Sequence, residues 1–257
     1  MDYIAPDARL AQLVAVSGRW REIEHLEVTE STNSVVAARA RAGVPAGLVV
    51  VADHQTAGRG RFARRWEDRP GGSLLMSCLV EAPARPTLVA LAAGLGVADA
   101  VARAGAEPEL KWPNDVLIAG RKCAGVLIEA PAGTERLVVG IGMNTDWRGE
   151  ARPGTTAPWT SIAEELDRDV DRWDVLVELL ETLDRRLGQG TDRLLADYRQ
   201  DCSTLGREVE VERRDRPIVG RAVDIDERGA LIVVTNDSTV VVDAGDVTHV
   251  RPVASGS

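Results

Sequence analysis

The residue pattern changes abruptly after Gly206, and this change constrains the fold more than any other feature. Residues 207–250 alternate apolar and polar side chains in short runs, separated by the turn-forming sequences DERGA, TNDST and DAGD. Short alternating strands with closely spaced turns are typical of a small β-barrel. We therefore predict two domains, a larger one over residues 1–204 and a β-barrel over residues 205–257.

The larger domain mixes strands and helices without regular alternation. Strands are predicted at 23–28, 47–55 and 71–82, two or three more within 109–130, and another at 135–147 that ends in a glycine-containing loop. Helices are predicted at 6–17, 29–43, 87–106 and within 158–202, where Thr160, Asp171 and Thr191 are candidate caps. Because the order is irregular, we expect an α+β domain with a mixed β-sheet and packed helices, not a doubly wound sheet.

Composition limits the location and partners of the chain. Hydrophobic residues make up 44% of it, which is enough for a core. The first residues lack the basic and apolar segments of a secretory signal. No run of about 18 apolar residues, the length needed to span a membrane, exists. The three cysteines are widely spaced, without a CxxC pair, so neither a zinc site nor a disulfide framework is indicated. We expect a cytoplasmic protein that does not bind membranes.

One glycine-rich segment gathers arginine although the chain is acidic. The chain has 31 Lys+Arg against 40 Asp+Glu, a net charge of −9, which argues against a general nucleic-acid binder. Yet the twelve residues from Gly58 to Arg69 contain five arginines. Glycine lets backbone N–H groups approach an anion, and arginine presents a planar fork to two oxygens. The segment indicates a phosphate or carboxylate site; the alternative is a solvated loop whose arginines pair with acids elsewhere.

The sequence LKWPNDVLIAGRKCAG, residues 110–125, holds a second group of candidates. Asn114 and Asp115 follow Pro113 at a predicted turn or strand start, where Asp115 would accept from a substrate or ligate Mg²⁺. Their alternative role is to close a hairpin. Lys122 begins the next apolar run, where a lone lysine is usually exposed to solvent.

Two shorter motifs complete the set. The sequence STN, Ser31 to Asn33, suits a helix N-cap, and its hydroxyls would also contact a ligand at the helix N-terminus. The sequence GIGMN, residues 140–144, has two glycines that would allow a ligand to approach closely, or would form a structural bulge.

Together and in this order, TESTNS, QTAGRGRFARRW, KWPNDVLIAGRKCAGVLIE and GIGMN resemble the biotin protein ligases, of the type without an N-terminal DNA-binding domain. The resemblance runs from about Leu26 to Asn144. It implies a class II synthetase-like catalytic domain that binds biotin and ATP, followed by a small SH3-like barrel. It also implies ATP-dependent ligation of biotin to a lysine of a biotin carboxyl carrier domain through biotinyl-5′-adenylate, with Mg²⁺.

The resemblance also implies roles for individual residues. Lys122, Arg59 and Arg61 would be catalytic, and Asp115 would lie near the metal. Biotin would be bound by Ser31, Thr32, Asn33, Gln55, Gly58, Arg59, Gly60, Arg61, Lys122, Gly125 and Leu127. ATP would be bound by Arg59, Arg61, Arg64, Trp66, Asn114, Asp115, Lys122, Gly142 and Asn144.

The sequence departs from the family pattern at one position and leaves partners open. Ala63 stands where many members have glycine, and alanine does not adopt positive φ freely. About 25 residues precede the first motif, too few for a DNA-binding domain, so no specific DNA binding is expected. The expected partner is the biotin carboxyl carrier domain of acyl-CoA carboxylases. A free sheet edge would pair with that domain or with a second copy, giving a monomer or a weak homodimer.

Three rival functions fit the residues less well. Lipoate ligases and octanoyltransferases resemble this fold, but octanoyltransferases work through a cysteine thioester, and lipoyl enzymes are expected to have a different loop. A nucleic-acid-binding module would need stacking aromatics, and residues 206–257 contain no Phe, Tyr or Trp. A non-catalytic biotin-binding scaffold is disfavoured because Lys122, Asp115 and Arg59 are all present.

Overall fold

The computed structural model describes residues 10–11, 14–15, 17–149, 158–212, 216–243 and 245–249. The helix predicted over residues 6–17 lies largely outside these ranges. No helix in the described part of the chain is long and apolar enough to cross a membrane.

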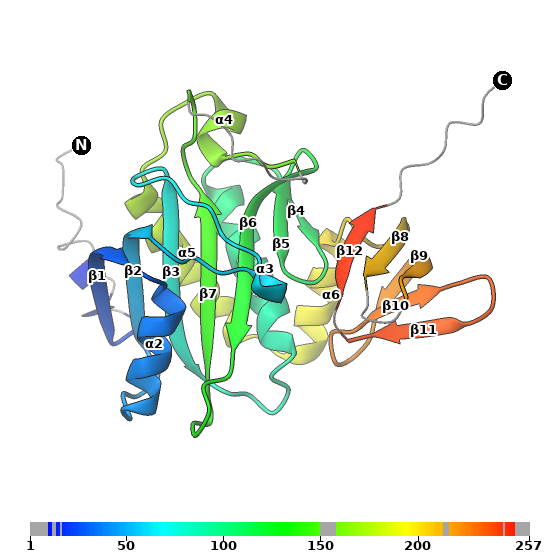
Figure 1. Cartoon of the computed structure of the whole chain (residues 1–257), viewed down its shortest axis with the longest axis horizontal. Coiled ribbons are helices and arrows are strands. Elements are labelled where there is room, and N and C mark those ends of the chain that lie inside the picture. The colour runs from blue at the N-terminus through cyan, green and yellow to red at the C-terminus, as the bar shows by residue number, and fades with distance from the viewer. Residues whose placement is uncertain are drawn as a thin grey trace.

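A seven-stranded mixed sheet forms the centre of the larger part of the chain (Figure 1). Its strands lie in the order β1-β2-β3-β7-β6-β5-β4, with β1 and β2 parallel and all other neighbours antiparallel. Their bounds are β1 Glu22–Thr29, β2 Leu48–Gln55, β3 Ser73–Glu81, β4 Pro108–Lys111, β5 Asp115–Ile118, β6 Arg121–Glu129 and β7 Arg136–Asn144. The predicted mixed sheet is confirmed.

Helices cover both faces of this sheet (Figure 1). Helix α2 lies on one face, and α3 and α5 lie on the other. The helices are α2 Thr32–Arg41, α3 Leu88–Arg103, α4 Ile162–Leu166, α5 Arg172–Leu187 and α6 Thr191–Asp201, with a 3₁₀ turn η1 at Arg61–Ala63. The helices predicted at 29–43 and 87–106 therefore form as expected.

The pleat of the strands sends alternate side chains to two separate cores. On β7, Val138 packs beneath α2, whereas Val139 and Ile141 belong to the large core beneath α3. Because side-chain direction alternates, Gly140 and Gly142 share the α2 face with Val138. On that face the two glycines leave the sheet surface without side chains, and this bare surface becomes the floor of the site described below.

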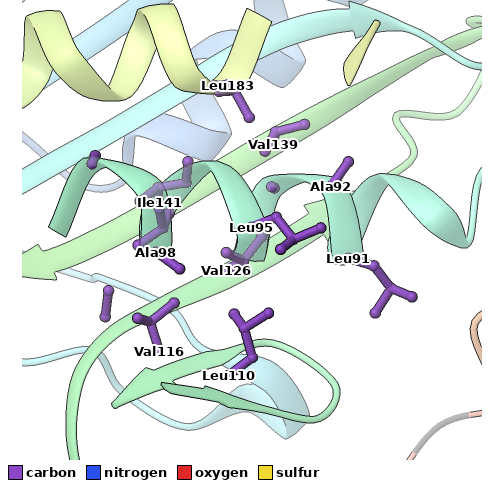
Figure 2. Packing of buried hydrophobic residues seen from close by; sticks show 14 of the residues in the cluster. Leu91, Ala92, Leu95, Ala98, Leu110, Val116, Val126, Val139, Ile141 and Leu183 are labelled. Atoms are coloured by element: carbon purple, nitrogen blue, oxygen red, sulfur yellow. The ribbon is translucent and has the colours of Figure 1, made fainter. Parts of the chain in front are cut away.

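The large core is built on the apolar helix α3. Leu91 and Leu95 are 2% and 0% exposed, and Figure 2 shows them among strand residues that include Leu110 and Val126. Leu183 of α5 lies on the other side of α3 in this view. Gly96 of α3 allows this close approach, because a Cβ at this position would lie 3.1 Å from the Cα of Leu183. This packing holds α3 and α5 on the face of the sheet opposite α2.

Three local predictions were wrong. The segment 158–202 forms three helices, whose N-caps are Ser161, Asp171 and Gly190, so only Asp171 caps as predicted. Ser161 forms a capping box with Glu164. The glycines of GIGMN lie inside β7, not in a loop after it, and the pairing of β7 with both neighbours runs through them without a bulge.

A second sheet follows the larger, seven-stranded part of the chain. Its five antiparallel strands lie in the order β11-β10-β9-β8-β12 (Figure 1). Their bounds are β8 Glu208–Glu212, β9 Ile218–Ile225, β10 Leu231–Val234, β11 Thr239–Val242 and β12 Asp246–His249. The predicted change to short strands after Gly206 is confirmed, but the described strands form an open sheet whose two end strands do not pair, not a closed barrel.

Candidate active site

The segment Gly58–Arg69, here called the arginine segment, crosses the α2 face of the sheet in front of β7 and β6 (Figure 1). Its base is closed by backbone bonds from Trp66 N–H to Gly58 O at 3.0 Å and from Gly60 N–H to Arg64 O at 2.7 Å. The positive φ of this segment falls at Phe62, with φ 55°. The left-handed position is therefore Phe62, next to the Ala63 that departs from the family pattern.

A cavity lies between the arginine segment and the strands. Its floor is glycine: a Cβ at Gly142 would lie 2.5 Å from the Trp66 ring, and one at Gly125 would lie 3.1 Å from Lys122 Nζ. The indole Nε1 of Trp66 is buried and has no hydrogen-bond partner among the described residues. The glycines thus give the Trp66 ring room against the sheet.

Lys122 and Asp115 form an ion pair in this cavity. Lys122 Nζ lies 2.6 Å from Asp115 Oδ1 and 5.4 Å from the centre of the Trp66 ring. The backbone of Lys122 is held as well, since its N–H donates to Pro158 O and its carbonyl accepts from Thr160 N–H. A lysine fixed in this way offers one preorganised positive charge at the centre of the cavity.

The five arginines of the segment have partners in the described residues. Carboxylates pair with three of them: Arg59 with Glu129, Arg64 with Glu212 and Arg65 with Glu67. Arg61 donates to Asn114 Oδ1 and to Gly245 O, both at 3.1 Å, and Arg69 donates to Asp146 O. The alternative in which these arginines pair with distant acids is therefore partly correct, although four of the five also line the cavity.

A chain of polar side chains forms the other end of the cavity. Gln55 Oε1 accepts from Thr32 N–H at 2.8 Å and lies 3.1 Å from Thr32 Oγ1. Ser77 Oγ lies 2.7 Å from Thr32 Oγ1 and 2.6 Å from Asn33 Oδ1. Ser31 stands at the N-cap of α2 but its side chain accepts no capping bond. This end therefore presents several fixed donors and acceptors, as recognition of a polar ring requires.

The three cysteines are buried thiols. Burial raises the pKa of Cys78 to about 12, and burial also raises the pKa values of Cys123 and Cys202. Glu165 and Glu164 add to the effect on Cys123. A thiol in this state is not a nucleophile near neutral pH, although Cys123 is adjacent to Lys122.

The residues around the cavity fit a metal ion only in part. Among the described residues, no group of three or more His, Cys, Asp or Glu side chains gathers to hold one. Mg²⁺ is commonly bound by one or two carboxylates, with phosphate oxygens and water completing its shell. Asp115 lines the cavity and fits such a site, in which the nucleotide would bring most of the ligands.

Comparison with known proteins identifies the family. The profile of the Biotin/lipoate A/B protein ligase family matches residues 25–146, and that of the Biotin protein ligase C terminal domain matches residues 204–250. A biotin–[acetyl-CoA-carboxylase] ligase of Mycobacterium tuberculosis is 38% identical, over 93% of both chains. This chain belongs to the biotin protein ligase family.

Solved structures of biotin protein ligases share the fold. The ligase of Aquifex aeolicus, in complex with biotin and ATP, superposes with a TM-score of 0.79 and 28% identity, covering 90% of this chain and 100% of that one. A second curated relative, the bifunctional ligase/repressor BirA of Escherichia coli, is 29% identical over 81% of this chain and 68% of its own length.

The structure brings most of the predicted residues of this biotin protein ligase to one cavity. The predicted residues that line it are Ser31, Thr32, Asn33, Gln55, Arg59, Gly60, Arg61, Arg64, Trp66, Asn114, Asp115, Lys122, Gly125, Leu127 and Gly142. Gly58 does not line it but lies at the base of the arginine segment, where a Cβ would be 2.7 Å from Trp66 O. Asn144 does not line it either, because its amide donates to Thr160 O at 3.0 Å.

Other lining residues were given no individual role by sequence reasoning. They are Phe62, Arg65, Met76, Val126, Gly140 and Ile141, of which Arg65 and Gly140 lie in motifs that the sequence did single out. Gly140 has the clearest signal: it stands two residues before Gly142 on the same strand, and strand alternation places the two on one face. Glu129, which holds Arg59, was also missed, since nothing in its local sequence distinguishes it.

Proposed function

We propose that this protein activates biotin with ATP and transfers it to a lysine of a biotin carrier domain. The observation that carries the proposal is the cavity itself. It joins a polar end around Thr32 and Asn33 to a cationic centre at Lys122 and Arg61. The polar end suits recognition of the ureido ring of biotin. The cationic centre suits binding of two anionic groups, the biotin carboxylate and the phosphates of ATP.

In the first reaction the biotin carboxylate attacks the α-phosphorus of ATP. A bond forms between a carboxylate oxygen and the α-phosphorus, the bond from the α-phosphorus to the bridging oxygen of the β-phosphate breaks, and pyrophosphate leaves. Because both reactants are anions, fixed positive charge must offset their repulsion. Lys122 supplies this charge between the carboxylate and the α-phosphate, and Arg59 and Arg61 supply it from the arginine segment. When bound, Mg²⁺ neutralises phosphate charge, and Asp115 is the carboxylate that would hold it.

In the second reaction the amine of the carrier lysine attacks the acyl carbon. A C–N bond forms, the C–O bond to the phosphate breaks, and AMP leaves, while the amine loses a proton. No enzyme nucleophile is required. This agrees with the burial of all three thiols, which removes support for the thioester route of octanoyltransferases.

The remaining assignments belong to the same proposal. Residues 1–204 form the catalytic domain and residues 205–257 an SH3-like domain, supported by the match of residues 204–250 to the family's C-terminal domain. The acceptor is the biotin carboxyl carrier domain of acyl-CoA carboxylases. The protein acts in the cytoplasm as a monomer or weak homodimer, without specific DNA binding.

The proposal is tested by the mass of a purified biotin carrier domain after incubation with this protein, biotin and Mg-ATP. We expect a gain of one biotin that requires ATP. Parallel reactions replace biotin with lipoate. A gain with lipoate alone would move the protein to the neighbouring lipoate ligases, and no gain with either acid would contradict the proposal.

A further inference from the structure

Glu129 is the last residue of β6 and touches two residues of different parts of the site. Its Oε2 accepts from Asn33 Nδ2 at 2.7 Å. The guanidinium of Arg59 donates through Nη2 to Oε1 at 3.2 Å and to Oε2 at 3.1 Å. A second nitrogen of Arg59, Nη1, donates to Ser34 Oγ at 2.8 Å. Arg59 is thus held against β6 and α2 at once.

These contacts complete a continuous polar chain across the site. It runs from Gln55 through Thr32 and Ser77 to Asn33, and then through Glu129 to Arg59. The Glu129 carboxylate only accepts, so the NH₂ group of Asn33 faces it and Asn33 Oδ1 faces the Ser77 hydroxyl. One carboxylate therefore orients an amide at the polar end of the cavity and binds an arginine of the segment that covers it.

We propose that Glu129 is a positioning residue that latches the arginine segment over the cavity through Arg59. The inference about the reaction rests on the function proposed above; the latch itself does not. Only a carboxylate fits the position, because all the groups that meet it are donors. A glutamine would offer one oxygen and one NH₂ group, and the NH₂ group would face another donor.

The latch is weak enough to open. The side chains of Arg59 and Glu129 are 41% and 35% exposed, so water and salt screen the pair. Such a contact suits a segment that must open to admit substrates and then stay closed over a reactive intermediate. Loss of the latch is therefore expected to speed opening without removing any group that touches the reacting atoms.

The first test needs no ligand and no activity. Trypsin cleaves after the arginines at positions 61, 64 and 65 when the segment opens. In Glu129→Gln we expect the cleavage rate at these sites to rise about threefold to tenfold. The matched control is Glu135→Gln, which removes an exposed carboxylate just before β7, outside this network. Equal cleavage rates in wild type and Glu129→Gln would overturn the latch.

The variant Ser34→Ala distinguishes two explanations of faster cleavage, loss of the latch and a general loss of structure. This variant removes the other partner of Arg59 and changes neither charge nor any contact of Asn33. We expect it to speed cleavage as well, and the double variant to show less than the sum of the two free-energy effects, because both act through Arg59. Strict additivity, or unchanged cleavage in Ser34→Ala, would contradict a latch that works through this arginine.

The second test measures how loss of the latch affects retention of the adenylate. Wild type and Glu129→Gln are loaded with labelled biotin and Mg-ATP, and release of the adenylate is followed after a chase with unlabelled biotin. We expect release of the adenylate to be about threefold to tenfold faster in the variant than in the wild type. Release at the wild-type rate would overturn the role in retention. Absence of adenylate in the wild type would overturn the proposed function, while the tryptic test would still judge the latch.

Discussion

Lys122 and Asp115 form an ion pair of 2.6 Å across neighbouring strands, in front of the Trp66 ring. The pairing register of β5 with β6 places Asp115 opposite Gly125, three residues after Lys122, so the lysine side chain extends along β6 to meet it. The absence of a Cβ at Gly125 gives the lysine that path, because a Cβ there would lie 3.1 Å from Nζ. The charge at the centre of the cavity is therefore fixed by a carboxylate, a glycine and an aromatic ring.

Replacing Lys122 should abolish most of the activation chemistry while leaving the fold intact. Lys122→Met keeps an unbranched apolar chain beside Trp66 but removes the charge. We expect the rate of adenylate formation to fall by about 10²- to 10³-fold, the usual loss when one stabilising group is removed from an anionic transition state. The measurement is single-turnover formation of adenylate from biotin and Mg-ATP.

The chain itself offers a matched control for this substitution. Lys111 and Lys122 are its only lysines, and Lys111 is not among the residues that line the cavity. Lys111→Met should form adenylate within about twofold of the wild-type rate. Equal losses in the two variants would show that overall charge, and not the position of Lys122, matters.

Substitutions at two glycines of β7 should affect the two ends of the cavity separately. A Cβ at Gly140 would lie 2.0 Å from Asn33 Oδ1, whereas one at Gly142 would lie 2.5 Å from the Trp66 ring. We expect Gly140→Ala to weaken biotin binding and Gly142→Ala to weaken ATP binding, each by about tenfold or more. Isothermal titration with each ligand measures both effects.

The control for the glycine pair is Gly190→Ala, since a Cβ at that position meets nothing within 4 Å. Its affinity for both ligands should equal that of the wild type. If Gly140→Ala and Gly142→Ala each weakened the binding of biotin and of ATP equally, the assignment of two separate ends would be wrong.

The thiols should be dispensable. All three are buried, and burial raises their pKa values, so a thiol reagent at pH 7.5 should not react with the folded protein. Ellman's reagent should report three thiols only after denaturation. Cys123→Ala should keep most of the ligase activity, and its complete inactivation with an unchanged melting temperature would point to thiol chemistry.

His249 should make the protein less stable in mild acid. Burial, with Lys111 and Arg207 nearby, lowers the pKa of His249 to about 4 from its ordinary value of 6.5. Between these two values the unfolded chain binds a proton that the folded chain does not, so stability falls as pH decreases from 6.5 to 4. The neutral ring also lies 3.2 Å from Thr204 Oγ1.

The variant His249→Gln tests this origin of the pH dependence. It keeps a polar side chain near Thr204 but cannot bind a proton. The difference in urea midpoint between pH 7 and pH 5 should be smaller in the variant than in the wild type. An identical difference in both proteins would assign the pH dependence to other groups.

Local patterns were sufficient for most of the elements and for the residues of the linear motifs. An apolar run of β-branched type predicted the strand around Val50, alternation predicted the short strands after Gly206, and the motif order predicted the residues of the cavity around Lys122. The errors arose where contacts with residues far away in sequence determine the local structure. Thr160 is not a cap because its carbonyl accepts from the side chain of Asn144, and Ser161 takes the capping role.

The same reason explains the missed parts of the site. Glu129 meets Arg59 and Asn33, which are 70 and 96 residues away in sequence, so no local pattern marks it. Asn144 stands in a glycine motif that suggested a ligand contact, yet the fold brings Thr160 O to its amide. Whether the C-terminal strands form an open sheet or a closed barrel likewise depends on pairing between strands far apart in sequence, which alternation alone does not determine.

The most direct test of the account is a single turnover with excess protein, biotin and Mg-ATP, without any carrier domain. We expect close to one biotinyl-adenylate per protein molecule, pyrophosphate in equal amount, and no change in the mass of the protein itself. The same reaction with Lys122→Met should yield almost none. Biotin joined covalently to the protein through a cysteine, or full adenylate formation by the variant, would contradict the mechanism derived from this cavity.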